Sequence, residues 1–223
     1  MKTIKWTLRT TAFLILISVF MVSCKKKKTA PTLTLNGDAQ ITLCLGETYT
    51  EAGASATDAY GDEVDVVITG DVDVTTVGNY TVTYTATDKN DNVTTAQTTV
   101  TIGMCVSSLL GDYTVAHDCT IDLQLTTIDI CSDNQTVIAG PSENEFIIDG
   151  FSTFVNQVSG SIDGTTVTIP SNVYSINLGI TSIDITISGS GTINPNGTEM
   201  VIDYAYDAGL AGSGTCTATY TKQ

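Results

Sequence analysis

Beyond residue 28, apolar and polar residues alternate with a period of two along much of the chain. Residues 81–87 (Thr-Val-Thr-Tyr-Thr-Ala-Thr) and residues 181–187 (Thr-Ser-Ile-Asp-Ile-Thr-Ile) show the alternation clearly. Successive side chains of a β-strand point to opposite faces, so the pattern predicts strands with one buried face. Gly, Asn and Asp interrupt it roughly every 8–12 residues, and no stretch after the leader keeps a helical period. We therefore predict an all-β protein built from sandwiches or barrels rather than βαβ units.

The first predicted domain, residues 31–102, carries Gly, Tyr, Ala and Asp at characteristic spacings. The positions are Gly46, Tyr49, Glu51, Gly53, Ala54, Ala56, Asp58, Gly61 and Asp62, followed by Val77, Gly78, Tyr80, Val82, Tyr84, Ala86, Asp88 and Asn92. This pattern resembles the bacterial Ig-like module of many surface proteins, a module that also occurs in a pesticidal crystal protein. The resemblance implies an Ig-like β-sandwich of short strands, acting as a spacer or binding unit. Ala52 and Asp91 depart from the family, which usually has Pro and Gly there.

A short linker, residues 103–110, leads to a second predicted domain at residues 111–223. Turn signals such as Asp163-Gly164 separate about eight to ten short strand segments in this domain. The segment resembles the small C-terminal β-domain that follows Ig-like modules in many Bacteroidota lipoproteins, a family of uncharacterised activity. We expect an antiparallel meander that closes into a barrel or a sandwich, since closure removes exposed strand edges.

Residues 1–23 have the three parts of an export signal. Lys2, Lys5 and Arg9 precede an apolar run over residues 12–22, and small Ser23 follows it. A transmembrane helix is the alternative, but it needs about 20 apolar residues, and this run has about half that length. We therefore predict a cleaved signal peptide.

Met21-Val22-Ser23-Cys24 resembles the lipobox of bacterial lipoproteins, although Leu is commoner than Met at its first position. The resemblance implies that Cys24 is lipidated and becomes the first residue of the mature chain. Residues 24–30 would then form a tether whose lysines, Lys25–Lys28, lie at the lipid headgroups. We expect a protein anchored in the outer membrane by its N-terminal lipid, and the sequence leaves open whether it faces the periplasm or the cell surface.

The charge of the mature body is strongly negative. The whole chain has a net charge of −15, but after residue 28 only Lys89 and Lys222 oppose 24 acidic residues, which gives −22. Nucleic-acid binding depends on Lys and Arg that displace counterions from phosphates, so we predict no nucleic-acid partner.

Residues with catalytic potential occur together once, at His117-Asp118-Cys119. Neighbours on a strand point to opposite faces, so these three cannot form a triad through adjacency. His117 is the only His in the chain and no Cys-x-x-Cys pair is present, which argues against a His/Cys zinc site. We predict no catalytic residues, and the protein is expected not to be an enzyme, although a pair of carboxylates for glycoside hydrolysis stays open.

Acidic residues in predicted turns are the remaining candidates for a ligand site. Oxygen ligands in loops suit Ca²⁺, and Asp is also an ordinary turn residue. The candidates are Asp58, Asp62, Asp65, Asp88 and Asp91. Our leading hypothesis has no cofactor and keeps Ca²⁺ as the alternative.

The function predicted from these features is that of a non-catalytic envelope or cell-surface lipoprotein with a structural, adhesive or partner-binding role. The alternative is a glycan-binding accessory lipoprotein of a carbohydrate-uptake system. Glycan binding would need several of the 12 aromatic residues of the mature chain on one exposed face. Most of them occupy strand positions where core packing is expected.

Export into an oxidising compartment favours disulfides. Apart from Cys24 there are five cysteines, so at least one is unpaired. In an Ig-like sandwich the first strand commonly ends parallel to the last one, which predicts Cys44–Cys105. A closed meander pairs its first and last strands, which predicts Cys119–Cys216 and leaves Cys131, although Cys131 could take either partner. The alternative is five reduced cysteines in the core.

Overall fold

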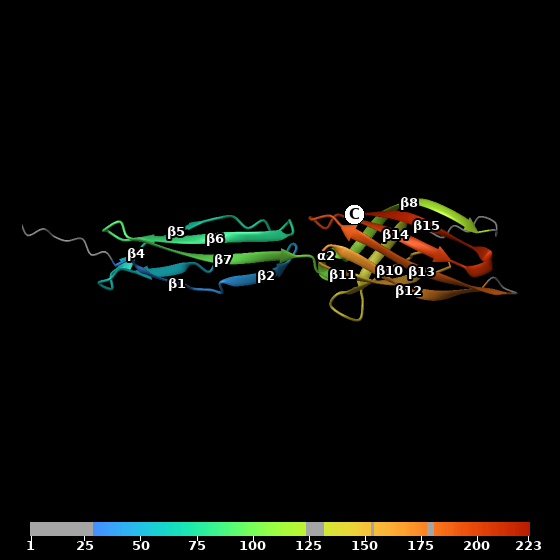
Figure 1. The fold of residues 1–223 in the computed structure, drawn as a ribbon, viewed down its shortest axis with the longest axis horizontal. Coiled ribbons are helices and arrows are strands. Elements are labelled where there is room, and N and C mark those ends of the chain that lie inside the picture. The colour runs from blue at the N-terminus through green and yellow to red at the C-terminus, as the bar shows by residue number, and fades with distance from the viewer. Residues whose placement is uncertain (1–28, 124–131, 153, 178–180) are drawn as a thin grey trace, which may run out of the picture. The chain divides into compact units, whose positions relative to one another are not determined.

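The structure, a computed structural model, describes residues 29–123, 132–152, 154–177 and 181–223. The predicted signal peptide, the lipidation candidate Cys24 and the odd cysteine Cys131 lie outside the described residues. Within the part of the chain that is described, no helix is long and apolar enough to cross a membrane. As predicted, strands dominate the fold (Figure 1).

Two β-sheets form a sandwich over residues 32–103, as the Ig-like resemblance implies. One sheet has the order β1-β3-β4 and the other the order β2-β7-β6-β5. The strands are β1 (Thr32–Leu35), β2 (Gln40–Cys44), β3 (Ala54–Thr57), β4 (Glu63–Val64), β5 (Val66–Thr69), β6 (Gly78–Thr87) and β7 (Val93–Gly103). β2 runs parallel to β7, with Gln40 opposite Thr99 and Cys44 opposite Gly103. This is the parallel pairing on which the Cys44–Cys105 prediction depends.

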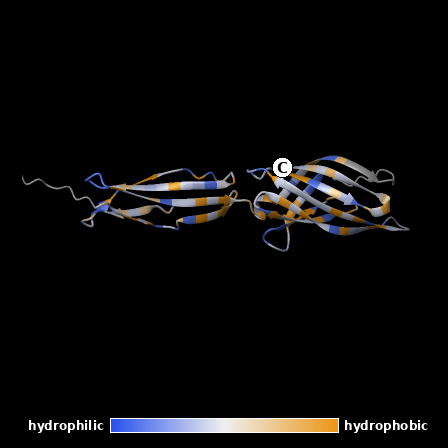
Figure 2. Ribbon diagram, viewed as in Figure 1, coloured by the Kyte–Doolittle hydropathy of each residue, from blue (hydrophilic) through white to orange (hydrophobic). Residues whose placement is uncertain are grey.

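Burial within the sandwich follows the predicted period of two. On β6, Val82, Tyr84 and Ala86 are buried, while the threonines between them are more exposed. Val100 and Ile102 are buried on β7 in the same alternating way. Figure 2 shows the alternation as apolar bands along the strands. The threonines of β6 therefore supply the solvent side of that strand, where a β-branched polar residue suits the extended backbone.

Residues 111–222 form a closed, eight-stranded antiparallel barrel, so of the two predicted alternatives the barrel is the one present. Each strand pairs with the next, and the last strand pairs with the first. The strands are β8 (Gly111–Leu123), β9 (Asn134–Ala139), β10 (Glu145–Asp149), β11 (Gln157–Asp163), β12 (Thr166–Asn177), β13 (Ser182–Ile193), β14 (Glu199–Asp207) and β15 (Gly212–Lys222). A short helix, α2 (Val106–Leu109), precedes β8, and a 3-10 turn, η1 (Gly209–Ala211), joins β14 to β15. Closure satisfies the backbone groups that an open sheet would leave exposed at its edges.

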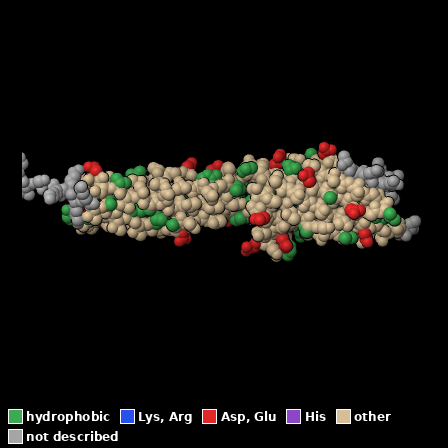
Figure 3. Space-filling model, in the orientation of Figure 1, with side chains coloured by type: hydrophobic (Ala, Val, Ile, Leu, Met, Phe, Trp, Pro, Cys, Tyr) green, Lys and Arg blue, Asp and Glu red, His purple; other side chains and the backbone are tan. Residues whose placement is uncertain are grey.

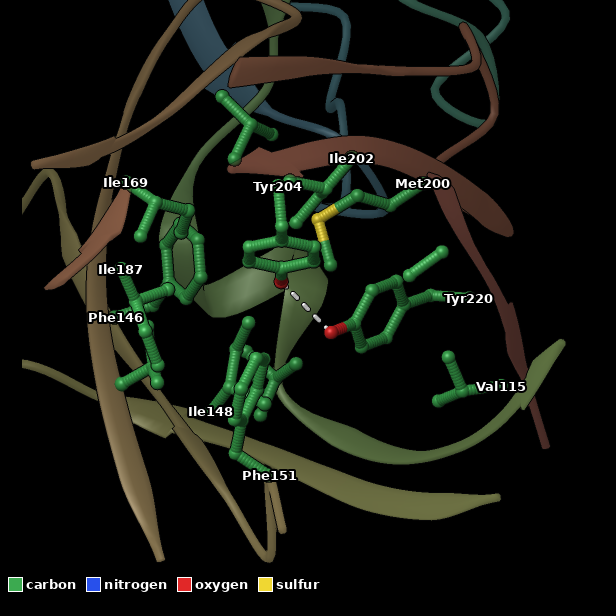
Figure 4. Close-up of a cluster of buried hydrophobic side chains, with 14 of the residues drawn as sticks. Val115, Phe146, Ile148, Phe151, Ile169, Ile187, Met200, Ile202, Tyr204 and Tyr220 are labelled. Carbon is green, nitrogen blue, oxygen red and sulfur yellow. Dashed lines mark hydrogen bonds between the residues drawn. The ribbon is translucent and has the colours of Figure 1, made fainter. Parts of the chain in front are cut away.

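Large side chains pack inside the barrel (Figure 4). The ring centroids of Phe151 and Tyr204 are 5.3 Å apart in an edge-to-face arrangement. Gly160 on β11 lies directly opposite Phe146 on β10, and a Cβ atom on Gly160 would lie 2.4 Å from the ring carbon Cζ of Phe146. The absence of a side chain at Gly160 therefore provides the space that the Phe146 ring occupies.

The chain divides into two compact units by its internal contacts. The first unit comprises the described residues up to Thr34, Ala54–Val67 and Tyr84–Ala96, and the second comprises Leu35–Gly53, Ile68–Thr83 and Gln97–Gln223. The second unit thus holds the whole barrel together with β2 and parts of β5, β6 and β7. The predicted linker contains α2.

Candidate functional site

The first acidic turn, between β3 and β4, is closed by its own carboxylate. Oδ1 of Asp58 accepts hydrogen bonds from the backbone N–H groups of Tyr60 (2.8 Å) and Asp62 (3.0 Å). The N–H of Asp58 donates to the carbonyl of Asp62 at 2.8 Å, and Gly61 has a φ of 88°. Asp58 is buried with 8% of its surface exposed, so the turn depends on this side chain.

The turn between β6 and β7 repeats the same design. Oδ1 of Asp88 accepts from the N–H groups of Asn90 (2.8 Å) and Asn92 (2.9 Å), and its Oδ2 accepts from Nδ2 of Asn92 (2.8 Å). Asp91 has a φ of 64° and occupies the place that Gly61 has in the first turn. Asp is one of the few residues that tolerate this left-handed conformation, which explains why the family's usual Gly can be replaced here.

Lys89 joins the two turns of the first unit. Its Nζ lies 3.4 Å from Oδ2 of Asp58 and 3.3 Å from Oδ2 of Asp62, and 5.2 Å from the ring centroid of Tyr60. Hydrogen bonds from the backbone of Tyr60 and Asp62 and from Lys89 lower the pKa of Asp58, against the opposing effect of its burial. Hydrogen bonds to Asp62 and Asp58 raise the pKa of Lys89.

These contacts bear on the residues that the sequence suggests as calcium ligands. Backbone donors and the Lys89 ammonium engage the oxygens of Asp58 and Asp62, while Asp88 is engaged within its own turn. Asp65 is exposed on the strand connection beyond β4. The geometry accounts for the acidic clusters as turn-forming residues, and calcium binding stays a prediction that this geometry does not strengthen.

A second polar cluster lies between the first and last strands of the barrel. β8 and β15 pair so that Cys119 lies opposite Cys216, and His117 lies opposite Ala218. Cys119 and Cys216 form a disulfide with Cα atoms 4.0 Å apart. A ring nitrogen of His117 and the two sulfur atoms all lie within 4.8 Å of one another. The register of two paired strands therefore brings together three residues that are separated by up to 99 positions in sequence.

A hydrogen-bonded network extends from His117 into the core. Nε2 of His117 lies 3.0 Å from the carbonyl oxygen of Ser132, and Nε2 of Gln135 donates to the same oxygen at 3.0 Å. Oε1 of Gln135 accepts from the hydroxyl of Tyr220 at 2.9 Å, and the Tyr220 hydroxyl lies 2.8 Å from that of Tyr204 (Figure 4). Gln135 is 2% exposed, so the network satisfies polar groups that burial would otherwise leave unpaired.

Nδ1 of His117 is the exception in this network. It is buried and has no hydrogen-bond partner among the residues that the structure describes. A carbonyl oxygen can only accept, so the contact with Ser132 places a proton on Nε2, and in the neutral ring Nδ1 then carries a lone pair.

The two disulfides are the pairs that the sequence analysis predicts. Cys44 at the end of β2 is bonded to Cys105, with Cα atoms 5.5 Å apart, and Cys119 is bonded to Cys216. Asp118 is exposed while His117 is partly buried, so the structure forms no triad from His117-Asp118-Cys119. Sequence reasoning missed that His117 approaches the disulfide, and the signal that could have revealed it is the shared strand face of His117 and Cys119.

The two lysines after residue 28 both make internal contacts. Lys89 is paired as described above, and Nζ of Lys222 donates to the carbonyl of Ser108 at 2.7 Å. On the face shown in Figure 3, acidic side chains are scattered over the surface rather than gathered in one patch. With two lysines against 24 acidic residues after residue 28, little of the negative charge is neutralised.

Aromatic residues are concentrated in the interior. Tyr84, Tyr113, Phe146, Phe151, Tyr204, Tyr206 and Tyr220 are all at most 3% exposed. Burial raises the pKa of Tyr113 to about 12, and its hydroxyl donates to the carbonyl of Leu109. Among the described residues, the aromatic side chains with large exposure are Tyr60 and Phe154, which belong to different units.

Comparison with known proteins identifies part of the chain. Residues 33–102 match the family model of the Ig-like domain of bacterial surface proteins. A search of curated protein sequences gives no match. The sandwich is therefore similar to the Ig-like domain of bacterial surface proteins, which agrees with the resemblance seen in the sequence.

Two solved structures are similar to the chain, with low TM-scores. One is the crystal structure of a lipoprotein from Bacteroides thetaiotaomicron, with 21% identity, a TM-score of 0.33, and coverage of 86% of this chain and 100% of that one. The other is the structure of CBM51-2 in complex with GlcNAc and INT domains from Clostridium perfringens ZmpB, with 13% identity and a TM-score of 0.28. That alignment covers 86% of this chain and 44% of the other. At these TM-scores neither likeness carries an argument about function.

Proposed function

We propose that this protein is a non-catalytic lipoprotein of the bacterial cell envelope, anchored in the outer membrane through acylated Cys24. The observation that carries the proposal is the match of residues 33–102 to the Ig-like domain of bacterial surface proteins. The lipobox-like sequence that ends at Cys24 and the basic tether Lys25–Lys28 support lipid anchoring. The disulfides Cys44–Cys105 and Cys119–Cys216 support a location outside the reducing cytosol.

A structural or partner-binding role agrees with how the described residues are used. The acidic side chains Asp58 and Asp88 close turns, and the buried network of Gln135, Tyr204 and Tyr220 stabilises the barrel core. Groups that serve stability in this way are poorly placed to act on a substrate. The proposal therefore assigns the protein to presentation or binding rather than catalysis.

The glycan-binding alternative lacks the feature that would favour it. A sugar platform needs several aromatic rings on one exposed face, and in the described part of the barrel Phe154 is the aromatic residue with large exposure. The uptake-system role is consequently the weaker hypothesis, and the proposed partner is a protein or an envelope component.

Fractionation of cells that make the wild-type protein or Cys24→Ser tests this proposal. The wild-type protein should sediment with outer membranes, and Cys24→Ser should appear in the soluble fraction with the same disulfides. Protease treatment of intact cells then distinguishes the cell surface from the periplasmic face. Recovery of both proteins from the cytosol would contradict the proposal, as would membrane association that does not depend on Cys24.

A further inference from the structure

The polar cluster between β8 and β15 has the composition of a metal site. We infer that His117, Cys119 and Cys216 bind a borderline-soft divalent cation such as Zn²⁺ when the Cys119–Cys216 disulfide is reduced. The inference does not depend on the envelope location proposed above. It concerns a site with one imidazole and two thiolates, a ligand set that suits zinc.

The distances fit such a site. One ring nitrogen of His117 and the two sulfur atoms already lie within 4.8 Å of one another. In a tetrahedral zinc site with bonds of about 2.0–2.3 Å, neighbouring ligand atoms are about 3.3–3.8 Å apart. Once the sulfur atoms are no longer bonded to each other, side-chain rotations can bring the three ligand atoms to these separations, because Cys119 and Cys216 stay opposite each other on paired strands.

The hydrogen bonding of His117 supports the same conclusion independently. Nε2–H donates to the carbonyl of Ser132, which leaves the lone pair of Nδ1 without a hydrogen-bond partner among the described residues. Metal-binding histidines commonly donate their second ring nitrogen to a carbonyl or carboxylate in this manner, which fixes the tautomer and the ring orientation. Gln135 donates to the same carbonyl and accepts a hydrogen bond from the Tyr220 hydroxyl. These bonds fix the position of the carbonyl that accepts from His117.

The redox step balances as a thiol–disulfide exchange. A dithiol reductant attacks Sγ of Cys119, which is the exposed partner, and forms a mixed disulfide while Cys216 leaves as a thiolate. The second thiol of the reductant then displaces Cys119, and the reductant is released as a disulfide after giving up two electrons and two protons. Zn²⁺ finally replaces the two thiol protons and forms two Zn–S bonds and one Zn–N bond, with water in the fourth position.

The sequence argued against a zinc site, because it has a single His and no Cys-x-x-Cys pair. The closed barrel changes this assessment, since it brings Cys216 from the last strand to His117 and Cys119 on the first. In the oxidised protein the two sulfur atoms are bonded to each other. The cation should therefore bind to the reduced protein and not to the oxidised protein.

Cobalt(II) is a suitable probe, because thiolate ligands give it charge-transfer absorption in the near ultraviolet. The full chain would carry Cys24→Ser, Cys44→Ser, Cys105→Ser and Cys131→Ser, so that Cys119 and Cys216 are the only thiols. After reduction with a dithiol and its removal without oxygen, we expect one Co²⁺ per chain and displacement of Co²⁺ by Zn²⁺. The oxidised protein should show no such band.

His117→Gln is the discriminating variant, since its amide can still donate to the Ser132 carbonyl but lacks the ring nitrogen Nδ1. It should bind Co²⁺ at least about 100-fold more weakly, given that loss of an outer hydrogen-bond partner alone costs about 10–100-fold. Asp118→Asn, on the opposite face of β8, is the matched control and should bind like the parent.

Three results would overturn the inference: no thiolate band in the reduced protein, equal affinity in His117→Gln, or equal affinity in the oxidised protein. If the cysteine-depleted chain does not fold, the comparison is made in the reduced wild-type chain. There the signal is the part of the thiolate band that His117→Gln removes, and a band of unchanged intensity in that variant contradicts the site.

Discussion

Lys89 and Asp58 form an ion pair between two turns of the first unit, with 3.4 Å between Nζ and Oδ2. The pair joins the loop that follows β6 to the loop that follows β3, and Asp62 contributes a second carboxylate at 3.3 Å. Lys89 is one of two basic residues in a body with 24 acidic ones, so this contact neutralises charge where two acidic turns meet. The turns would otherwise repel each other.

Asp58→Asn tests this arrangement through its pH dependence. The folded protein lowers the pKa of Asp58 below its ordinary value of 3.8, so the ionised side chain stabilises the fold above that pH. This stabilisation is lost as the pH falls through the folded-state pKa. We expect the variant to melt below the wild type at pH 7 and the two melting temperatures to converge below about pH 3.8.

Asp65→Asn is the matched control, because Asp65 is an exposed carboxylate in the neighbouring connection. Its substitution should change stability by no more than about 0.5 kcal/mol. A difference between wild type and Asp58→Asn that persists unchanged into strong acid would show that the charge of Asp58 is not what stabilises the turn.

Asp91 adopts a left-handed backbone, with φ of 64°. Replacement by Gly removes a conformational strain of roughly 1–2 kcal/mol and adds an entropic cost of roughly 0.5–1 kcal/mol, so Asp91→Gly should be neutral or slightly stabilising. Asp91→Val should cost about 1–3 kcal/mol, because β-branched residues tolerate this conformation poorly. Urea unfolding measures both, and equal stability of the two variants would contradict the assigned turn.

Gly160 provides space for Phe146 inside the barrel. A Cβ atom there would lie 2.4 Å from Cζ of Phe146 and 2.7 Å from Cδ1 of Ile169. Gly160→Val should therefore destabilise the barrel by about 1–3 kcal/mol or more through overpacking. Combining it with Phe146→Leu should recover part of this loss, and a double-mutant cycle measures the coupling. Strictly additive effects would mean that the two positions do not share the space.

The Cys44–Cys105 disulfide closes a separation of 61 residues. In the chain-entropy model, closing a loop of this size contributes about 4 kcal/mol to the free energy of unfolding. The Cys44→Ala/Cys105→Ala protein should therefore lose at most about 4 kcal/mol of this free energy. Denaturant unfolding measures the loss, and peptide mapping without reduction verifies the connectivity. A Cys105–Cys119 linkage in the map would be incompatible with the fold described here.

Much of the architecture follows from local sequence. The period of two in residues 81–87 and 181–187 is present as β6 and β13, and the parallel pairing of β2 with β7 brings Cys44 to Cys105 as expected. These features need only strand alternation and the topology that the Ig-like pattern implies.

Other features depend on long-range register and could not be read from the pattern. Apolar and polar residues alternate in the same way in a barrel and in a sandwich. The sequence pattern therefore could not show that β15 pairs with β8 and closes a barrel. The approach of His117 to Cys216 requires the residue-by-residue register of those two strands. The Lys89–Asp58 pair likewise joins turns that are separated by about 30 residues of chain.

Lipid anchoring at Cys24 can be tested by measuring the mass of the N-terminal peptide of the protein purified from membranes. The mature chain should begin at Cys24 and carry acyl groups on that residue, with residues 1–23 absent. Because trypsin cleaves after lysine, the acyl groups should be found on short peptides that begin at Cys24 and end within Lys25–Lys28. A chain that begins at Met1, or an unmodified Cys24 in membrane-bound protein, would contradict the account.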